Sequence, residues 1–116
     1  MNFINKVELQ GTIGRVSTTN IADKLCTRFS MATNYCYKDR DGNAVRETTW
    51  HNVVAFAGEN TGDAPNLNKG DKVLVKGRIQ NRNYITESGE PKQITEILAN
   101  EVRVIKNDQF VINPEK

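Results

Sequence analysis

The segment WHNVVAF, residues 50–56, is rich in β-branched and aromatic side chains and therefore reads as a β-strand. Successive side chains of a strand point to opposite faces, so Val53 and Ala55 fall on one face while Trp50 and Phe56 fall on the other. If Val53 and Ala55 fill a barrel, both rings stand on its exterior. Large apolar rings are disfavoured there unless something covers them. Core or subunit-interface packing of Trp50 stays open at this point.

The same period of two recurs along most of the chain, between clusters of Gly, Asn and Asp. In the first of these runs Gly11 and Gly14 stand where a long strand can bend or bulge. The stretch 17–24 reads as a polar connection, and the Asp41-Gly42 pair as a hairpin turn. Strands are predicted at about 3–16, 25–37, 45–56, 72–87 and 92–105.

Residues 57–67 are the one stretch that could hold a helix, and Gly58, Gly62 and Pro65 limit it to a turn or two. Five strands with bent first and fourth members, and at most a short helix between the third and fourth, are the arrangement of an OB-fold. This is a partly open, all-β Greek-key barrel that binds oligonucleotides or oligosaccharides. Another all-β Greek key stays possible. We expect one OB-fold domain over 1–106 and a short C-terminal tail over 107–116.

The composition is that of a globular chain with a single domain. The 116 residues carry a net charge of +2, with 26% charged and 37% hydrophobic residues. No segment is apolar enough to span a membrane and no secretory signal begins the chain, so we expect a cytoplasmic location. Cys26 and Cys36 fall in one predicted strand, about 33 Å apart, which is too far for a disulfide. With one histidine and no CxxC pair, no metal site or cofactor is expected.

The predicted strand over 72–87 has one strongly basic face. A solvated strand face can show the same pattern. Beside the exposed rings of Trp50 and Phe56, however, it matches what single-stranded nucleic acid needs, because cations follow the phosphates and rings stack on bases of any sequence. The candidate residues on this face are Lys72, Lys76, Arg78, Arg82 and Tyr84.

The second predicted strand and the lone histidine add weaker candidates. Tyr37 ends that strand beside Lys38 and Arg40, but its parity matches that of the apolar Phe29, so a twist or bulge is needed to turn it outward. His51 has no nearby nucleophile or paired carboxylate, so we expect a packed or interface histidine and no enzymatic activity.

Several stretches together resemble the bacterial single-stranded DNA-binding protein (SSB) family in order and spacing. They are residues 5–11, 50–56, the Lys69-Gly70 pair and residues 75–80, and the similarity covers roughly residues 4–105. The resemblance implies an OB barrel, a homotetramer and a nucleoid-associated protein. Its activity would be to coat single-stranded DNA, without sequence preference, in replication, recombination and repair.

The resemblance also implies roles for individual residues. It makes Trp50, Phe56, Tyr84 and Tyr37 base-stacking residues, Lys38, Arg40, Lys69 and Arg82 phosphate contacts, and His51 a subunit-interface residue. The chain departs from the family at Ala57-Gly58-Glu59, where a Gly-Lys pair and a helix-forming run are usual. It also ends at residues 113–116 without an acidic tip, so we do not expect recruitment of replication proteins through such a tip.

Two other functions stay open on the sequence. The first is a primosome-like or recombination-accessory OB-fold module that docks onto other proteins and binds DNA weakly. The second is an enzyme or an oligosaccharide-binding OB domain, which the absence of a catalytic constellation makes the weaker alternative.

Overall fold

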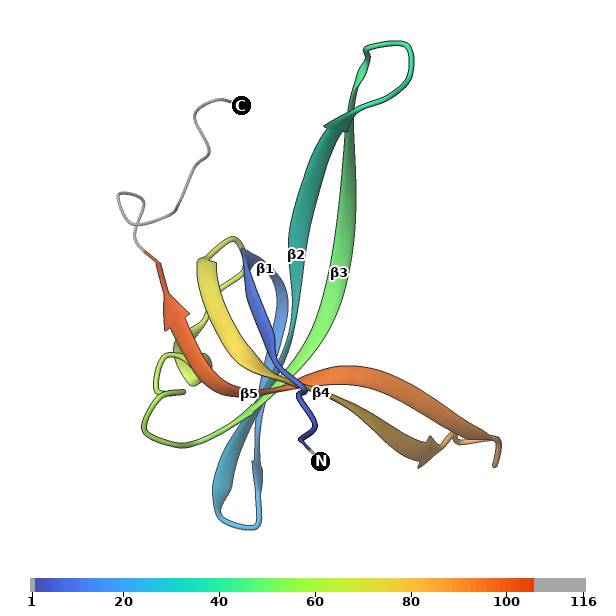
Figure 1. Cartoon of the computed structure of the whole chain (residues 1–116). Coiled ribbons are helices and arrows are strands. Elements are labelled where there is room, and N and C mark those ends of the chain that lie inside the picture. The colour runs from blue at the N-terminus through green and yellow to red at the C-terminus, as the bar shows by residue number, and fades with distance from the viewer. Residues whose placement is uncertain (1, 106–116) are drawn as a thin grey trace.

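The computed structural model of the protein describes residues 2–105, which form five strands closed into a barrel (Figure 1). The predicted all-β, five-stranded barrel with one short helix is confirmed. The predicted tail over 107–116 lies outside the described residues. The elements are β1 (Val7–Ile21), β2 (Lys24–Lys38), β3 (Ala44–Phe56), the 3-10 helix η1 (Ala64–Asn66), β4 (Lys72–Ile85) and β5 (Pro91–Val104).

The strand order around the barrel is β1-β2-β3-β5-β4, with β4 returning to β1. Every neighbouring pair is antiparallel except β3 and β5, which run parallel where Val53 pairs with Ile97. β1 hydrogen-bonds to β4 through Val7–Thr12 and to β2 from Thr12 onward. The barrel therefore closes because one strand is shared between two halves of the sheet.

The core is built from the inward positions that the alternation predicts. Val53 and Ala55 of β3 are buried, as are Phe29 and Met31 of β2. Each large apolar side chain removed from water contributes about 1.5–3 kcal/mol. Val54 shares the parity of Trp50 but is only 2% exposed, and it pairs with Arg28 of β2 and Leu98 of β5. The remaining core members are Ile13, Ala64, Leu67, Val73, Val75, Ile97, Ala99 and Val102.

The expected polar connection over 17–24 is wrong, because β1 continues to Ile21 and pairs there with Lys24 of β2. Only Ala22 and Asp23 remain as the loop, with φ of 49° and 66°. Two consecutive positive φ values are the geometry of a type I′ hairpin turn, which usually carries Asn or Gly. This turn was not predicted because Ala22 and Asp23 are not the Asn or Gly residues that usually indicate it.

The start of the first strand also differs from the prediction, since β1 begins at Val7 and not near residue 3. The side chain of Asn5 takes the place of strand pairing at this edge. Its Nδ2 donates to the Ile79 carbonyl at 2.8 Å, and its Oδ1 accepts the Ile79 N–H at 2.9 Å. One side chain thus satisfies two backbone groups of β4.

Two long hairpins leave the barrel as arms, one formed by β2 and β3 and the other by β4 and β5 (Figure 1). Ile79, which the alternation places inside, is 48% exposed because β4 leaves the barrel at this point. The arms carry side chains far beyond the core, where neither face of the ribbon is covered by the barrel.

We expect Asp23→Gly to stabilise the protein, because glycine adopts a positive φ without the steric cost that a side chain incurs there. The free energy of unfolding should rise by about 0.5–1 kcal/mol, measured by urea unfolding. Asp41→Gly is the matched control at another hairpin tip, since Asp41 has no positive φ. An equal gain for both variants, or no gain at Asp23, would contradict this account.

Candidate nucleic-acid interface

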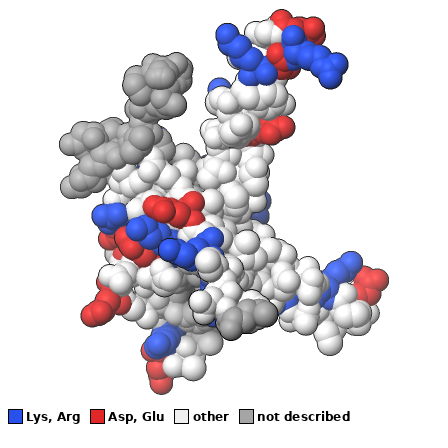
Figure 2. Space-filling model, viewed as in Figure 1, with Lys and Arg blue, Asp and Glu red and all other residues white. Residues whose placement is uncertain are grey.

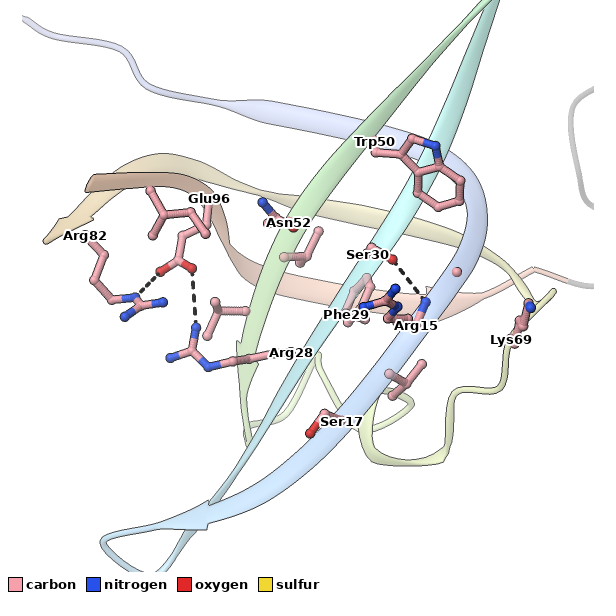
Figure 3. A pocket seen from close by; sticks show the side chains of 15 residues that line it. Arg15, Ser17, Arg28, Phe29, Ser30, Trp50, Asn52, Lys69, Arg82 and Glu96 are labelled. Carbon is pink, nitrogen blue, oxygen red and sulfur yellow. Dashed lines mark hydrogen bonds and ion pairs between the residues drawn. The ribbon is translucent and has the colours of Figure 1, made fainter. Parts of the chain in front are cut away.

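A groove of about 720 Å³ runs over the outer face of β3, between β1 and β2 on one side and the β4–β5 arm on the other (Figure 3). Its lining is mixed, with one indole, several small polar side chains, four cationic side chains and one carboxylate. The lining residues are Gly14, Arg15, Val16, Ser17, Arg28, Phe29, Ser30, Trp50, Asn52, Val53, Val54, Lys69, Arg82, Ile94 and Glu96.

Trp50 lies at one end of the groove and rests on a bulge in β1 (Figure 3). The register between β1 and β2 shifts between Ile13 and Val16, and the N–H of Arg15 donates to Ser30 Oγ at 3.0 Å. A Cβ at Gly14 would come within 2.6 Å of the indole. Glycine therefore permits this close approach, while 60% of the tryptophan stays exposed to a ligand.

At the other end of the groove Glu96 joins two arginines (Figure 3). Its Oε1 accepts from Arg82 Nε at 3.0 Å and from Gln80 Nε2 at 3.2 Å, and its Oε2 accepts from Arg28 at 3.3 Å. The Glu96 side chain is 2% exposed, whereas those of Arg28 and Arg82 are 41% and 40% exposed. The carboxylate is thus buried and paired, while both cations reach the solvent.

Arg82 also connects the groove to the β4–β5 arm. Its guanidinium carbon lies 5.7 Å from the centre of the Tyr84 ring, within the range of a cation–π contact. Tyr84 is 42% exposed on the arm. Arg82 therefore links the charged end of the groove to an exposed ring on the arm.

Of the residues predicted from the sequence, the structure brings Trp50, Lys69 and Arg82 together in the groove. Phe56 is exposed on the same face of β3 as Trp50, but it lies at the end of the strand and outside the groove lining. Tyr84 stands beside the groove through its contact with Arg82.

The basic positions of β4 do not form one continuous track, because the strand curves around the barrel (Figure 1). Lys76 lies between Glu8 of β1 and Glu101 of β5 in the strand register, so acidic neighbours flank it. Lys72 pairs with Thr12, and Arg78 is exposed beside Leu98. None of these three cations lines the groove.

The remaining candidates lie on the β2–β3 arm. The register of this arm is unbroken from Cys26 to Lys38, so no bulge turns Tyr37, which lies on the ribbon face opposite Trp50. Tyr37 is nevertheless 39% exposed, because the arm projects beyond the barrel, and its ring centre is 5.9 Å from that of Tyr35. Lys38 and Arg40 lie near the tip, where Figure 2 shows both positive and negative side chains.

Arg15, Arg28, Asn52 and Glu96 line the groove but were not predicted as site residues. The alternation of β2 does place Arg28 opposite the core residue Phe29. Nothing local, however, pairs it with Glu96, which is 68 positions away in the chain. A contact between residues so far apart in the chain cannot be predicted from the alternation of side chains along one strand.

His51 sits on the face of β3 opposite Trp50, half-buried, with its Nε2 2.9 Å from Thr33 Oγ1. Burial lowers the pKa of His51 below its ordinary value of 6.5, because desolvation disfavours the charged ring. Within residues 2–105, no group of three or more His, Cys, Asp or Glu side chains is placed to hold a metal ion. In the same range no helix has the length and apolar character needed to cross a membrane.

A closed five-stranded barrel with a short helix between β3 and β4, and an open groove across its outer face, is an OB-fold domain. The model of the single-strand binding protein family matches residues 4–105, and the chain belongs to this family.

Known members of the family show how far the similarity reaches. The single-stranded DNA-binding protein of Xanthomonas axonopodis pv. citri is 41% identical over 106 residues, which is 88% of this chain and 58% of the relative. That of Neisseria meningitidis serogroup A is 34% identical over 105 residues, 88% of this chain and 60% of the relative. The chain thus spans about three fifths of the length of these relatives.

Among solved structures, the Plasmodium falciparum SSB complex with ssDNA is similar to the whole barrel. It has a TM-score of 0.76 and 30% sequence identity, and the match covers 90% of this chain and 96% of that chain. The OB-fold predicted from the strand pattern is therefore confirmed.

We expect Gly14→Ala to displace the indole of Trp50, because the added Cβ would also come within 2.8 Å of Ser30 Oγ. The cost should be about 1–3 kcal/mol of unfolding free energy, together with a shift in the tryptophan emission maximum. Gly62→Ala is the control, since nothing lies within 4 Å of its Cβ position and its φ is not positive. Unchanged emission in Gly14→Ala would show that the indole does not rest on β1.

The lowered pKa of His51 predicts how stability depends on pH. The unfolded chain takes up the His51 proton at higher pH than the folded protein, so the free energy of unfolding should fall as pH drops below 6.5. His51→Gln, which can still bond to Thr33, should flatten this decline between about pH 7 and about pH 5.5 in urea unfolding. Identical declines for both proteins would contradict the assignment.

Proposed function

We propose that this protein binds single-stranded DNA without sequence preference, by stacking bases on exposed rings and attracting phosphates with the cations of the groove. The observation that carries the proposal is a 60% exposed tryptophan at one end of a groove that also presents Arg15, Arg28, Lys69 and Arg82. Stacking contributes about 1–3 kcal/mol per base and accepts any base, because every base has a π-face.

The groove favours a single strand because Trp50 and the four cations lie on an open surface. Bases in a duplex are stacked on each other and cannot reach Trp50, whereas the bases of a single strand can. Binding of this kind needs no reacting group, and we propose that the protein is not an enzyme. The names of two of its relatives state single-stranded DNA binding.

The other predicted residues extend the path of the strand beyond the groove. Exposed Phe56 and Tyr84 lie on the same side as the groove or next to it, and Tyr37 offers a further ring on the β2–β3 arm. The proposed phosphate contacts outside the groove are Lys38 and Arg40 near the arm tip and Lys72, Lys76 and Arg78 on β4.

We also propose that the protein assembles as a homotetramer, with His51 at an interface. The support is the family to which the chain belongs and the apolar surface that one copy leaves exposed, with Phe3 86%, Ile4 84% and Ile85 72% accessible. In this form it would coat single strands during replication, recombination and repair, in the cytoplasm and associated with the nucleoid.

Titration with oligo(dT) tests the proposal, since Trp50 is the only tryptophan and reports on stacking directly. Its fluorescence should fall on binding, and affinity should fall with salt by about 0.7 in log–log slope per phosphate contacted. In a separate assay with labelled oligo(dT), Trp50→Ala should weaken binding by about 1–3 kcal/mol and Trp50→Phe by less.

Duplex DNA of the same length is the matched ligand control and should bind much more weakly. Equal affinity for both forms, or no change in Trp50 emission with oligo(dT), would contradict the proposed function. Native mass measured on the free protein decides separately whether four copies assemble.

A further inference from the structure

Arg28, Arg82 and Gln80 converge on Glu96, so that one carboxylate pairs with two arginines. Glu96 accepts three hydrogen bonds with its two oxygens, and its side chain is 2% exposed. A buried carboxylate is costly unless it is paired and hydrogen-bonded. Here both conditions are met, so the carboxylate is held firmly in one place.

The two arginines come from opposite walls of the groove. Arg28 belongs to β2, whereas Arg82 belongs to β4 at the root of the β4–β5 arm. Glu96 on β5 lies between them and is within 3.3 Å of both guanidinium groups. The carboxylate therefore sets where each guanidinium sits relative to the other.

Each arginine keeps donors available after pairing with Glu96. A guanidinium carries five N–H groups, and each one uses a single nitrogen in its bond to the carboxylate. Their side chains are 41% and 40% exposed, and both line the groove. The cluster of two cations and one carboxylate has a net charge of +1, so it attracts an anion.

We propose that Arg28 and Arg82 form a subsite for one backbone phosphate of the bound strand, and that Glu96 is the positioning residue that holds both guanidinium groups ready for it. The inference rests on the proposed function and adds Arg28 and Glu96 to it. Planar guanidinium groups match the oxygens of phosphate, and fixing them beforehand reduces the rotamer freedom lost on binding.

A purely electrostatic role and a positioning role for Glu96 predict opposite effects of Glu96→Gln on DNA binding, so the inference is testable. If Glu96 only reduced the positive charge of the groove, Glu96→Gln would strengthen DNA binding and steepen its salt dependence. If Glu96 positions the arginines, the same variant weakens binding. Glu96→Asp separates the two effects further, because it keeps the charge but is one methylene too short to reach both arginines.

The experiment measures affinity for labelled oligo(dT) against salt concentration in the full chain. We expect Arg28→Ala to lower affinity about tenfold near 0.1 M salt and to reduce the salt slope by about 0.7, the value for one phosphate on a single strand. Glu96→Gln and Glu96→Asp should each lower affinity about threefold or more. In an Arg28→Ala background, the Glu96 variants should lower DNA affinity clearly less, because one of the two arginines that Glu96 positions is already absent.

Matched controls come from the ion pair of Arg103 and Glu101, which lies 3.6 Å apart on β5 and outside the groove. Arg103→Ala and Arg103→Gln each lower the net charge by one, as Arg28→Ala does, and should change affinity less than about twofold. Urea unfolding of each variant separates loss of binding from loss of fold. Should a Glu96 variant fail to fold, Arg28→Lys, which keeps the charge and loses the planar fork, replaces it and should weaken binding.

Two results would overturn the inference. One is an Arg28→Ala affinity and salt slope no different from those of Arg103→Ala. The other is a folded Glu96→Asp protein that binds as tightly as the wild type. In either case the wild-type protein still binds oligo(dT) and Trp50 emission still falls, so the proposed function survives. Failure of the wild type to bind at all is the separate result that contradicts the function itself.

Discussion

The bend of β1 between Ile13 and Val16 is the constraint on which both the barrel and the groove depend. β1 pairs with β4 along Val7–Thr12 and with β2 from Thr12 onward, and a strand shared in this way must curve to close a small barrel. The bulge provides this curvature. It also places Gly14 beneath Trp50, so the feature that closes the core seats the indole as well.

Barrel closure on the opposite side determines the other end of the groove. The short parallel pairing of β3 with β5 brings Glu96 alongside the outer face of β3 and between Arg28 and Arg82. The charge cluster thus depends on three strands that meet only in the folded barrel. A rigid core in this way supports a surface that is both aromatic and cationic, and the two arms extend that surface away from the barrel.

Several aromatic rings stay exposed at a cost in stability. Trp50, Tyr35, Tyr84 and Phe56 leave between 39% and 67% of their surface accessible, which a fold built for stability alone would cover. Nearby residues of the same chain cover part of two of these rings. Trp50 lies over Gly14, and Tyr84 lies beneath Arg82. The uncovered remainder is the surface to which the proposed function assigns the bases.

The sequence alone determined the five strands, the inward set around Val53 and Ala55, and the outward Trp50 and Phe56, because a period of two is a local property of the backbone. The alternation also led to Arg82 as a site residue, and the resemblance to the family led to Lys69. Only the tertiary structure decided that Lys76 faces Glu8 and Glu101, and that Arg28 and Arg82 converge on Glu96. The reason is that strand curvature and barrel closure set which distant side chains meet, and alternation along one strand contains no information about either.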